Sequence, residues 1–358
     1  MLDRCSAAFG PTVARLAAAG VALGAASFGV ALVAGRSGTA WGALDASFLF
    51  FAGLSAGGVA LGAAVRVAHG RWAGPLLPIA DASVGFFGPA LAVLAVLVLA
   101  QRSFMPPGPA AGAGHVAALV LRQMALTLVL FIAGRRFIAR ARAPGAEEGQ
   151  SRAAAVAYLL CYAVVLSFWA SDLIMGLTAS PPATVIPAYY FLGAFLSGLA
   201  WVALVAAVRG TSGPDLRHDL GKLLFAFIVV WTYLLWALFL PTWYANVPEE
   251  SEQLLRRWHG GYRPVSVFVL VAVFAWPFWL LFSERFKRRR ATLAVGAAAI
   301  LLGLLAERFL LVLPSLEVVA VPGSWIVYAG VAVGVAGLFL ISVGSRLASI
   351  ERGDTAAG

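Results

Sequence analysis

Residues 44–67, LDASFLFFAGLSAGGVALGAAVRV, form an apolar stretch with one acid near its start and one arginine near its end. About 20 apolar residues in a helix are enough to cross the hydrocarbon core of a bilayer. Windows of this kind recur ten times, so the sequence predicts an all-α integral membrane protein with ten transmembrane helices. We expect one polytopic membrane domain over residues 1–358, with spans at about 12–34, 44–67, 76–100, 115–134, 152–175, 184–208, 218–243, 264–283, 290–313 and 324–346.

The overall composition supports the same class. Of the 358 residues, 61% are hydrophobic and only 12% are charged, about half the charged share of a typical soluble domain. A soluble core cannot bury so much apolar side chain. The two cysteines, Cys5 and Cys161, are too few for a four-cysteine zinc or iron–sulfur site.

The net charge of +10 is explained by topology. With the N-terminus in the cytoplasm, nineteen of the 26 Lys and Arg residues fall on cytoplasmic segments and helix ends, five fall on the opposite side, and Arg122 and Arg308 lie within spans. The positive-inside rule therefore predicts a multi-pass protein with both termini in the cytoplasm; the resemblance described below implies that its membrane is the bacterial inner membrane. A nucleic-acid partner is not expected.

Pairs of glycines spaced four residues apart occur in three of the spans. Small residues at this spacing let helix backbones approach closely in a bilayer, where the hydrophobic effect does not drive association. We expect generic helix packing at Gly20 and Gly24, Gly53 and Gly57, Gly58 and Gly62, and Gly330 and Gly334.

Ionisable residues inside spans are costly and are therefore candidates for function. Near the outer ends lie Asp45, Arg122, Asp172, Glu307 and Arg308. Near the inner ends lie Asp81, His218, Asp219 and Lys222, and hydroxyl groups such as that of Tyr233 lie between the two groups. Two proton half-channels would require two such polar clusters, one near each end of the spans, separated by an apolar region in the middle of the membrane.

A structural interpretation competes with the proton path. Arg122 and Arg308 would neutralise Asp172 and Glu307 as packing pairs. Lys222, His218 and Asp219 would then only reach the membrane interface.

The four histidines predict neither haem nor metal. His69, His115, His218 and His259 lie in loops or at span ends, whereas a haem with two histidine ligands needs them inside facing helices. No two of them are four residues apart on one helix face. We expect no redox cofactor bound by this chain alone.

The loop after the seventh span carries many charged residues, on the outer side of the membrane, where charged residues are otherwise few. Trp243 and Tyr244 suit the headgroup region, and Pro248 ends the helix. The residues that follow must face water, and we expect a docking surface for other subunits at Asn246, Glu249, Glu250, Arg256 and Arg257.

Several stretches together resemble the ActF subunit of bacterial alternative complex III, a quinol:cytochrome c/oxidase oxidoreductase, and more widely the NrfD/PsrC-type membrane proteins. The matching stretches are His218–Leu223, Trp231–Leu234, Trp243–Glu250, Ser167–Met175, Pro277-Phe278 followed by Lys287-Arg288, and Glu307 with Pro314. The chain departs from the family pattern at 176–181 and at 237–239.

The resemblance implies an NrfD-like fold with two four-helix bundles, spans 2–5 and 6–9, flanked by spans 1 and 10. It implies a scaffold subunit of an electron-transport or respiratory-chain complex, with a role in a quinone site or a proton conduit, and not catalytic alone. The implied partners are a paralogous NrfD-like membrane subunit, multi-haem and mono-haem cytochrome c subunits and an iron–sulfur subunit, with lipid around them. The quinone or menaquinone would belong to the complex.

Two other functions remain open on the residues. Buried acids are compatible with a free-standing proton-coupled transporter, for which paired helix interruptions at mid-membrane would be expected. An NrfD-type membrane anchor of a molybdenum/iron–sulfur oxidoreductase would share the fold and differ in its partners.

Overall fold

The computed structural model describes residues 1–100, 113–143, 148–177, 184–245, 255–258, 261–316 and 323–353. These residues form helices joined by turns and short connections, with no strand among them, and ten helices are long and apolar enough to span a membrane. The prediction of an all-α, ten-helix membrane protein is confirmed.

Most of the ten spans are single helices. These are α2 (Pro11–Val33), α3 (Ser37–Val67), α6 (Ala113–Ala141), α7 (Glu148–Leu173), α8 (Ile186–Arg209), α9 (Pro214–Ala245), α14 (Arg290–Val312) and α15 (Ser324–Glu351). The third and eighth spans each consist of several consecutive helical segments. The third span consists of η1 (Arg71–Leu76), α4 (Leu77–Ala82), η2 (Ser83–Phe86) and α5 (Phe87–Ala100). The eighth span consists of α11 (Arg263–Val269), η5 (Leu270–Ala275) and α12 (Trp276–Phe282). Short helices are α1 (Leu2–Phe9), η4 (Met175–Leu177), α13 (Glu284–Lys287) and η6 (Leu313–Leu316).

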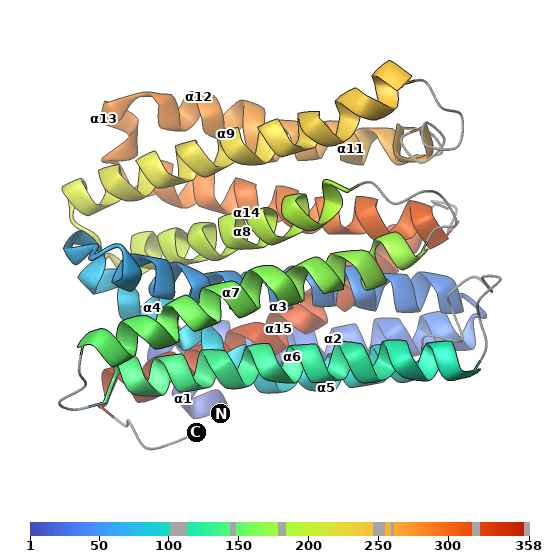
Figure 1. The fold of residues 1–358 in the computed structure, drawn as a ribbon, viewed down its shortest axis with the longest axis horizontal. Helices are drawn as coiled ribbons and strands as arrows, with labels where there is room; N and C mark the ends of the chain where they lie inside the picture. The colour runs from blue at the N-terminus through green and yellow to red at the C-terminus, as the bar shows by residue number, and fades with distance from the viewer. Residues whose placement is uncertain are drawn as a thin grey trace.

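The helices form two four-helix bundles. In the first, α3 packs against α5 and α7, and α6 lies between α5 and α7. In the second, α8 packs against α9 and α14, and α11 and α12 contact α14, with α12 also touching α9. The bundles meet where α3 and α7 pack on α8 and where α14 packs on α3 (Figure 1).

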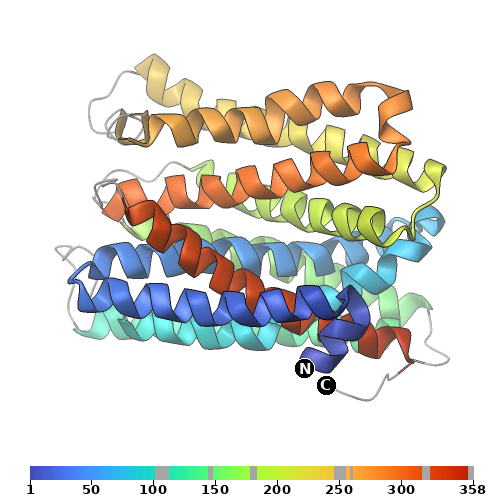
Figure 2. The ribbon, with the colours of Figure 1, turned by 180° about the vertical axis from the view of Figure 1, so that it is seen from behind.

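Two helices flank these bundles. Figure 2 shows α15 crossing the back of the molecule obliquely, beside α2, and the two termini lying close together. α3 is almost wholly buried, because it touches the flanking helix α15 and both bundles, whereas α9 is mostly exposed on its outer side.

The glycine pairs lie at the crossings of these helices. A Cβ added to Gly334 on α15 would lie 2.7 Å from the Cα of Gly24 on α2. One added to Gly198 on α8 would lie 2.8 Å from the carbonyl oxygen of Gly57 on α3. Glycine is required at both crossings, because the backbones approach more closely than any side chain would allow.

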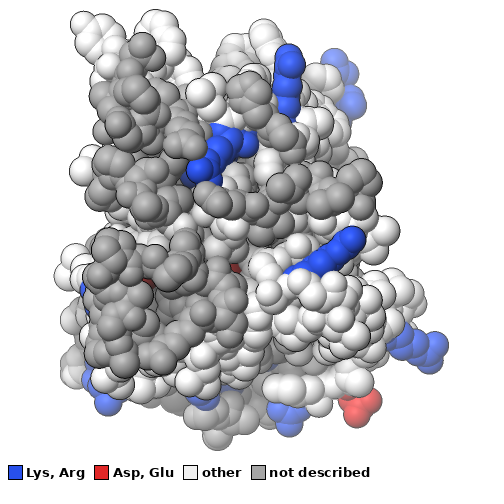
Figure 3. Space-filling view, turned by 90° about the vertical axis from the view of Figure 1, so that its right-hand side faces the viewer, with Lys and Arg blue, Asp and Glu red and all other residues white. Residues whose placement is uncertain are grey.

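The two ends of the molecule are distinguishable by their connections. The end that carries the termini, called here the termini end, also holds the turns that join α3 to η1, α8 to α9 and α13 to α14. Figure 3 looks onto the opposite end, where the described surface is mostly uncharged and carries a few separate Lys and Arg side chains.

Candidate functional site

A buried polar cluster lies where the two bundles meet. It is centred on Glu307 and Arg308, consecutive residues of α14 that are only 3% and 1% exposed. The Nη1 of Arg308 lies 3.0 Å from the Oε2 of Glu307. Removing two opposite charges from solvent is tolerated when they neutralise each other and their remaining polar atoms are engaged.

Two tyrosines of α8 complete the surroundings of this ion pair. Tyr189 lies close enough to Glu307 to interact electrostatically with its carboxylate. The guanidinium carbon of Arg308 lies 4.5 Å from the ring centroid of Tyr190, close enough for a cation–π interaction. The hydroxyl of Tyr190 donates to the carbonyl of Leu49 on α3, at 2.9 Å, so this residue links the two bundles.

Asp45 of α3 adds a second carboxyl group to the same region. It is 1% exposed, and neither carboxylate oxygen has a hydrogen-bond partner among the described residues. It lies near enough to Tyr190, across the bundle interface, that an ionised Asp45 would interact with this tyrosine electrostatically. A buried carboxyl group without a partner is unfavourable for folding, so its presence is a stronger indication of function than that of a paired acid.

A tryptophan of α9 closes the cluster on the side of the second bundle. Trp231 is 1% exposed, its ring centroid lies 5.7 Å from that of Tyr189, and its indole N–H has no hydrogen-bond partner in the described chain. A Cβ added to Gly193 would lie 2.7 Å from the Nη2 of Arg308 and 3.6 Å from the Cδ1 of Trp231. Gly193 therefore provides the space in which Arg308 and Trp231 meet.

Arg257 connects the cluster with the end opposite the termini. Its Nε donates to the carbonyl of Leu310 at 3.2 Å, and its charge acts on Glu307 and Tyr189. Desolvation lowers the pKa of this guanidinium. We name Asp45, Tyr189, Tyr190, Trp231, Arg257, Glu307 and Arg308 the interbundle cluster.

Asp172 lies apart from the interbundle cluster, between α6 and α7 of the first bundle. Its carboxylate accepts from the Nε of Arg122 at 3.1 Å and also contacts the Nη2 of Arg122 and the Nε2 of Gln123. Asp172 is 8% exposed and Gln123 is buried, whereas Arg122 is 42% exposed. Its carboxylate is held by both neighbours, so the geometry matches the packing alternative.

The candidates expected at the inner mouth divide between the two bundles. Asp81 is fully buried in the first bundle. The Nη1 and Nη2 atoms of Arg66 donate to its two carboxylate oxygens at 2.9 and 2.8 Å, and the Nε of Arg142 donates to Oδ2 at 2.9 Å. Lys222 pairs with Asp219 at 3.2 Å on the exposed surface of α9. The structure does not bring Asp81 and Lys222 together.

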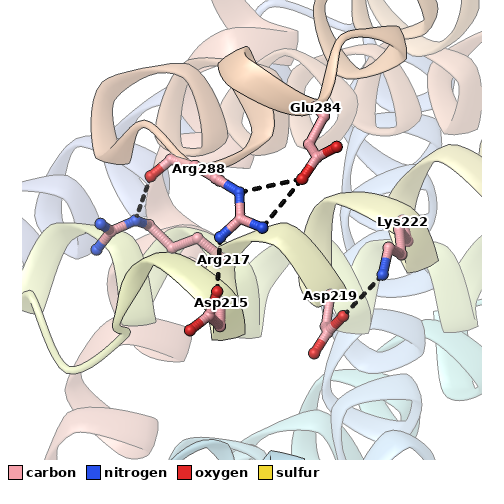
Figure 4. A network of polar contacts seen from close by, with 6 residues as sticks. All are labelled: Asp215, Arg217, Asp219, Lys222, Glu284 and Arg288. Atoms are coloured by element: carbon pink, nitrogen blue, oxygen red, sulfur yellow. Dashed lines mark hydrogen bonds and ion pairs between the residues drawn. The ribbon is translucent and has the colours of Figure 1, made fainter.

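An exposed ion network lies beside the Asp219–Lys222 pair at the start of α9. Figure 4 shows Arg288 between Asp215 and Glu284, with N–O distances of 2.6 and 3.0 Å. Arg217 donates to the carbonyl of Arg288 at 2.8 Å. The Arg288 guanidinium lowers the pKa of Glu284, and the charges of His218 and Lys222 lower it further. This network ties α9 to α13.

The remaining candidates have surface or undescribed positions. Tyr233 is 67% exposed on the outer side of α9, and Arg256 is exposed. Asn246, Glu249 and Glu250 lie outside the described residues, so a docking role for that loop stays a prediction.

The sequence interpretation missed several partners. Tyr189, Tyr190, Gln123, Arg66 and Arg142 were not singled out, although each contacts a predicted acid or its arginine. An adjacent Tyr-Tyr pair in an apolar span, and a glutamine next to Arg122, were the available signals.

The described residues contain no group of His, Cys, Asp and Glu suited to hold a metal ion. No family model matches this chain, and no curated protein matches it in sequence. The chain is a multi-pass membrane protein by the length and hydropathy of its helices.

Proposed function

We propose that this chain is an integral membrane subunit of a quinol-oxidising electron-transfer complex resembling alternative complex III, without a redox centre of its own. The observation that carries the proposal is the meeting of two family-like stretches in the interbundle cluster. The ring of Trp231, from the stretch on α9, lies 5.7 Å from that of Tyr189, and Glu307, from the stretch on α14, pairs with Arg308, which meets Trp231 at Gly193. Family-like residues that meet at one buried site support a function shared with the family more strongly than family-like stretches that lie apart in the structure.

The arrangement of the helices supports the same proposal. Two four-helix bundles with two flanking helices are what the resemblance implies. The alternative of a free-standing transporter gains little support, because the irregular turns η2 and η5 occur in the second helix of one bundle and the third of the other. Transporters with internal repeats have their interruptions in corresponding positions.

Tyr233 favours a subunit over an isolated protein. It lies eleven residues after Lys222 and ten before Trp243, which places it about 15 Å from either end of the apolar stretch. Its hydroxyl is on the exposed side of α9 and makes no hydrogen bond within the described chain. Lipid tails offer no partner for such a group, whereas another membrane subunit or a quinone carbonyl would.

Quinol oxidation releases two electrons and two protons. In the proposed complex the electrons pass to haem and iron–sulfur groups of other subunits, and this chain handles protons. The interbundle cluster is suited to proton transfer, because it brings the Glu307 carboxylate near the Tyr189 hydroxyl and holds a second carboxyl group, that of Asp45, without a hydrogen-bond partner among the described residues. Polar relays of carboxyl groups and hydroxyls inside membranes are a recurring means of moving protons.

The same proposal gives the protein an orientation, with the termini end in the bacterial cytoplasm and the opposite end towards the cytochromes. Fusions of alkaline phosphatase and of a fluorescent protein to the C-terminus test it. We expect fluorescence and no phosphatase activity; active phosphatase would overturn the orientation.

Purification of the tagged chain from its native membrane in mild detergent tests the function. We expect haem-stained cytochrome c subunits and quinol:cytochrome c reductase activity in the same fraction. Purification with a molybdenum subunit would favour the anchor alternative, and purification of the chain alone would overturn the proposal.

Within the assembled complex, Glu307→Gln tests the role of the interbundle cluster. We expect slower proton release coupled to quinol oxidation, with unchanged subunit composition. The matched control is Glu351→Gln, which removes an exposed acid that pairs with Arg209 at the termini end. Equal rates in the two variants would exclude Glu307 from the proton route.

A further inference from the structure

Five basic residues lie where the eighth span is joined to the ninth. The eighth span ends at Phe282 and the ninth begins at Arg290, and the basic residues of this stretch are Arg285, Lys287, Arg288, Arg289 and Arg290. The chain turns at Ser283, whose extended backbone (φ −77°, ψ 131°) separates α12 from α13. A short link between two consecutive spans lies at the membrane surface, at the depth of lipid headgroups.

Three of these basic side chains are engaged within the protein. Arg288 pairs with two acids (Figure 4), and Arg290 donates to two backbone carbonyls at the end of α8. The stem of Lys287 packs on Gly221 of α9, and its Nζ lies 5.5 Å from the ring centroid of Phe225. These contacts fix the link against the second bundle.

The other two basic side chains, those of Arg285 and Arg289, face outwards. Both residues are exposed, and neither side chain forms an ion pair or a hydrogen bond among the described residues. Arg285 lies within α13 and Arg289 two residues beyond its end, a separation of about one helical turn. Two guanidinium groups at this spacing are available to one anionic group.

Exposed aromatic side chains accompany these two arginines. Trp279, Phe282 and Phe286 are 73%, 64% and 42% exposed. The guanidinium carbon of Arg289 lies 5.6 Å from the ring centroid of Phe286. Tryptophan favours the boundary between acyl chains and headgroups. We name Trp279, Phe282, Arg285, Phe286 and Arg289 the aromatic–basic surface.

We propose that the aromatic–basic surface binds an anionic phospholipid, with the phosphate at Arg285 and Arg289 and an acyl chain against the aromatic rings. Arginine recognises phosphate through paired N–H donors, and basic residues next to a membrane span attract anionic headgroups. Trp279 and Phe282 belong to the eighth span itself. A free phosphate ion would make no use of these rings, and a soluble acidic protein would not reach them.

Native mass spectrometry of the full chain measures the binding, after delipidation and titration with dioleoyl phosphatidylglycerol or dioleoyl phosphatidylcholine. We expect phosphatidylglycerol to bind more tightly than phosphatidylcholine. Arg285→Gln and Arg289→Gln should each weaken its binding about five-fold, and the double variant about 25-fold. Both side chains are exposed and make no hydrogen bond among the described residues, so we expect the variants to fold. Wild-type binding by the double variant would overturn the proposal.

A matched control separates this surface from general attraction to charge. Arg15→Gln/Arg71→Gln removes two exposed arginines from the termini end, at the start of α2 and of η1. We expect this control to bind phosphatidylglycerol like the wild type, and an equal loss in the control would overturn the site.

Two further outcomes would assign the surface to another ligand. Inorganic phosphate should raise the melting temperature less than phosphatidylglycerol does, and an equal rise would overturn the lipid as the ligand. If the double variant retains phosphatidylglycerol and its purified complex instead loses a soluble subunit, the surface binds a protein and the proposal is wrong.

Discussion

The guanidinium of Arg308 lies over the ring of Tyr190, 4.5 Å from its centroid, and the two residues join α14 to α8 at the centre of the molecule. Arg308 also neutralises Glu307, the only described acid within 4.0 Å of it. One side chain therefore supports both the packing of the second bundle and the charge of the interbundle cluster.

Replacing Arg308 by methionine is expected to destabilise the protein strongly. The change leaves Glu307 buried without its counter-charge, which typically lowers the free energy of unfolding by about 3–5 kcal/mol. Thermal unfolding in detergent measures the effect. The double variant Glu307→Gln/Arg308→Met should recover much of the loss, and an equally unstable double variant would contradict this explanation.

Gly334→Ala should destabilise the packing of α15 on α2. The new Cβ would lie 2.7 Å from the Cα of Gly24, which is backbone and cannot rotate away, and overpacking of this kind lowers stability by about 1–3 kcal/mol. Gly29→Ala on α2 is the matched control, because a Cβ there meets nothing within 4 Å. Equal melting temperatures for the two variants would contradict the close crossing.

Gly24 and Gly334 also show how far the sequence predicts this fold. The ten spans follow from apolar windows, and the glycine motifs predict where backbones approach. The motifs do not say which helices meet, because any small-residue face fits another equally well. That choice depends on packing over the whole bundle.

The polar site was predicted less completely for a similar reason. Asp45 and Glu307 stand out because charge is rare in a span. Tyr189 and Tyr190 do not, because a tyrosine in an apolar stretch is compatible with ordinary packing or with a position at the interface. Asp81 and Lys222 were both predicted at the inner ends of spans, but the contacts of Asp81 with Arg66 and Arg142 were not, because partners from other helices cannot be read from spacing along one helix.

The Glu284–Arg288 pair should loosen in acid. Arg288 lowers the pKa of Glu284 below its ordinary value of 4.5. A carboxyl group whose pKa is lowered by folding stabilises the folded state above its unfolded pKa, and this contribution is lost as the pH falls through the folded pKa. Hydrogen exchange of α13 in nanodiscs, corrected for intrinsic rates, should increase below about pH 4.5. Glu284→Gln should abolish this pH dependence; an unchanged profile would assign it to other acids.

Asp172→Asn should mainly affect stability. Arg122 and Gln123 both hold the carboxylate, so the variant leaves the Arg122 charge less well paired and lowers the melting temperature. In proteoliposomes of the assembled complex we expect quinol oxidation and proton release near wild-type rates. A selective loss of proton release, with normal assembly, would instead place Asp172 on the proton route.

Asp45→Asn should have the opposite profile. Asparagine has nearly the same shape as aspartate, and the Asp45 oxygens have no hydrogen-bond partner to lose among the described residues. The variant removes a carboxyl group from an apolar interior, where a charged form is unfavourable, so we expect an unchanged or higher melting temperature.

If Asp45 accepts protons on the route through the interbundle cluster, an amide cannot replace it, because the amide does not titrate in this range. Proton release coupled to quinol oxidation should therefore slow down while the complex assembles normally. Asp45→Glu is the conservative comparison and should restore part of the rate, since it keeps a titratable group. Wild-type proton release in Asp45→Asn would show that the unpaired carboxyl group has no part in proton transfer.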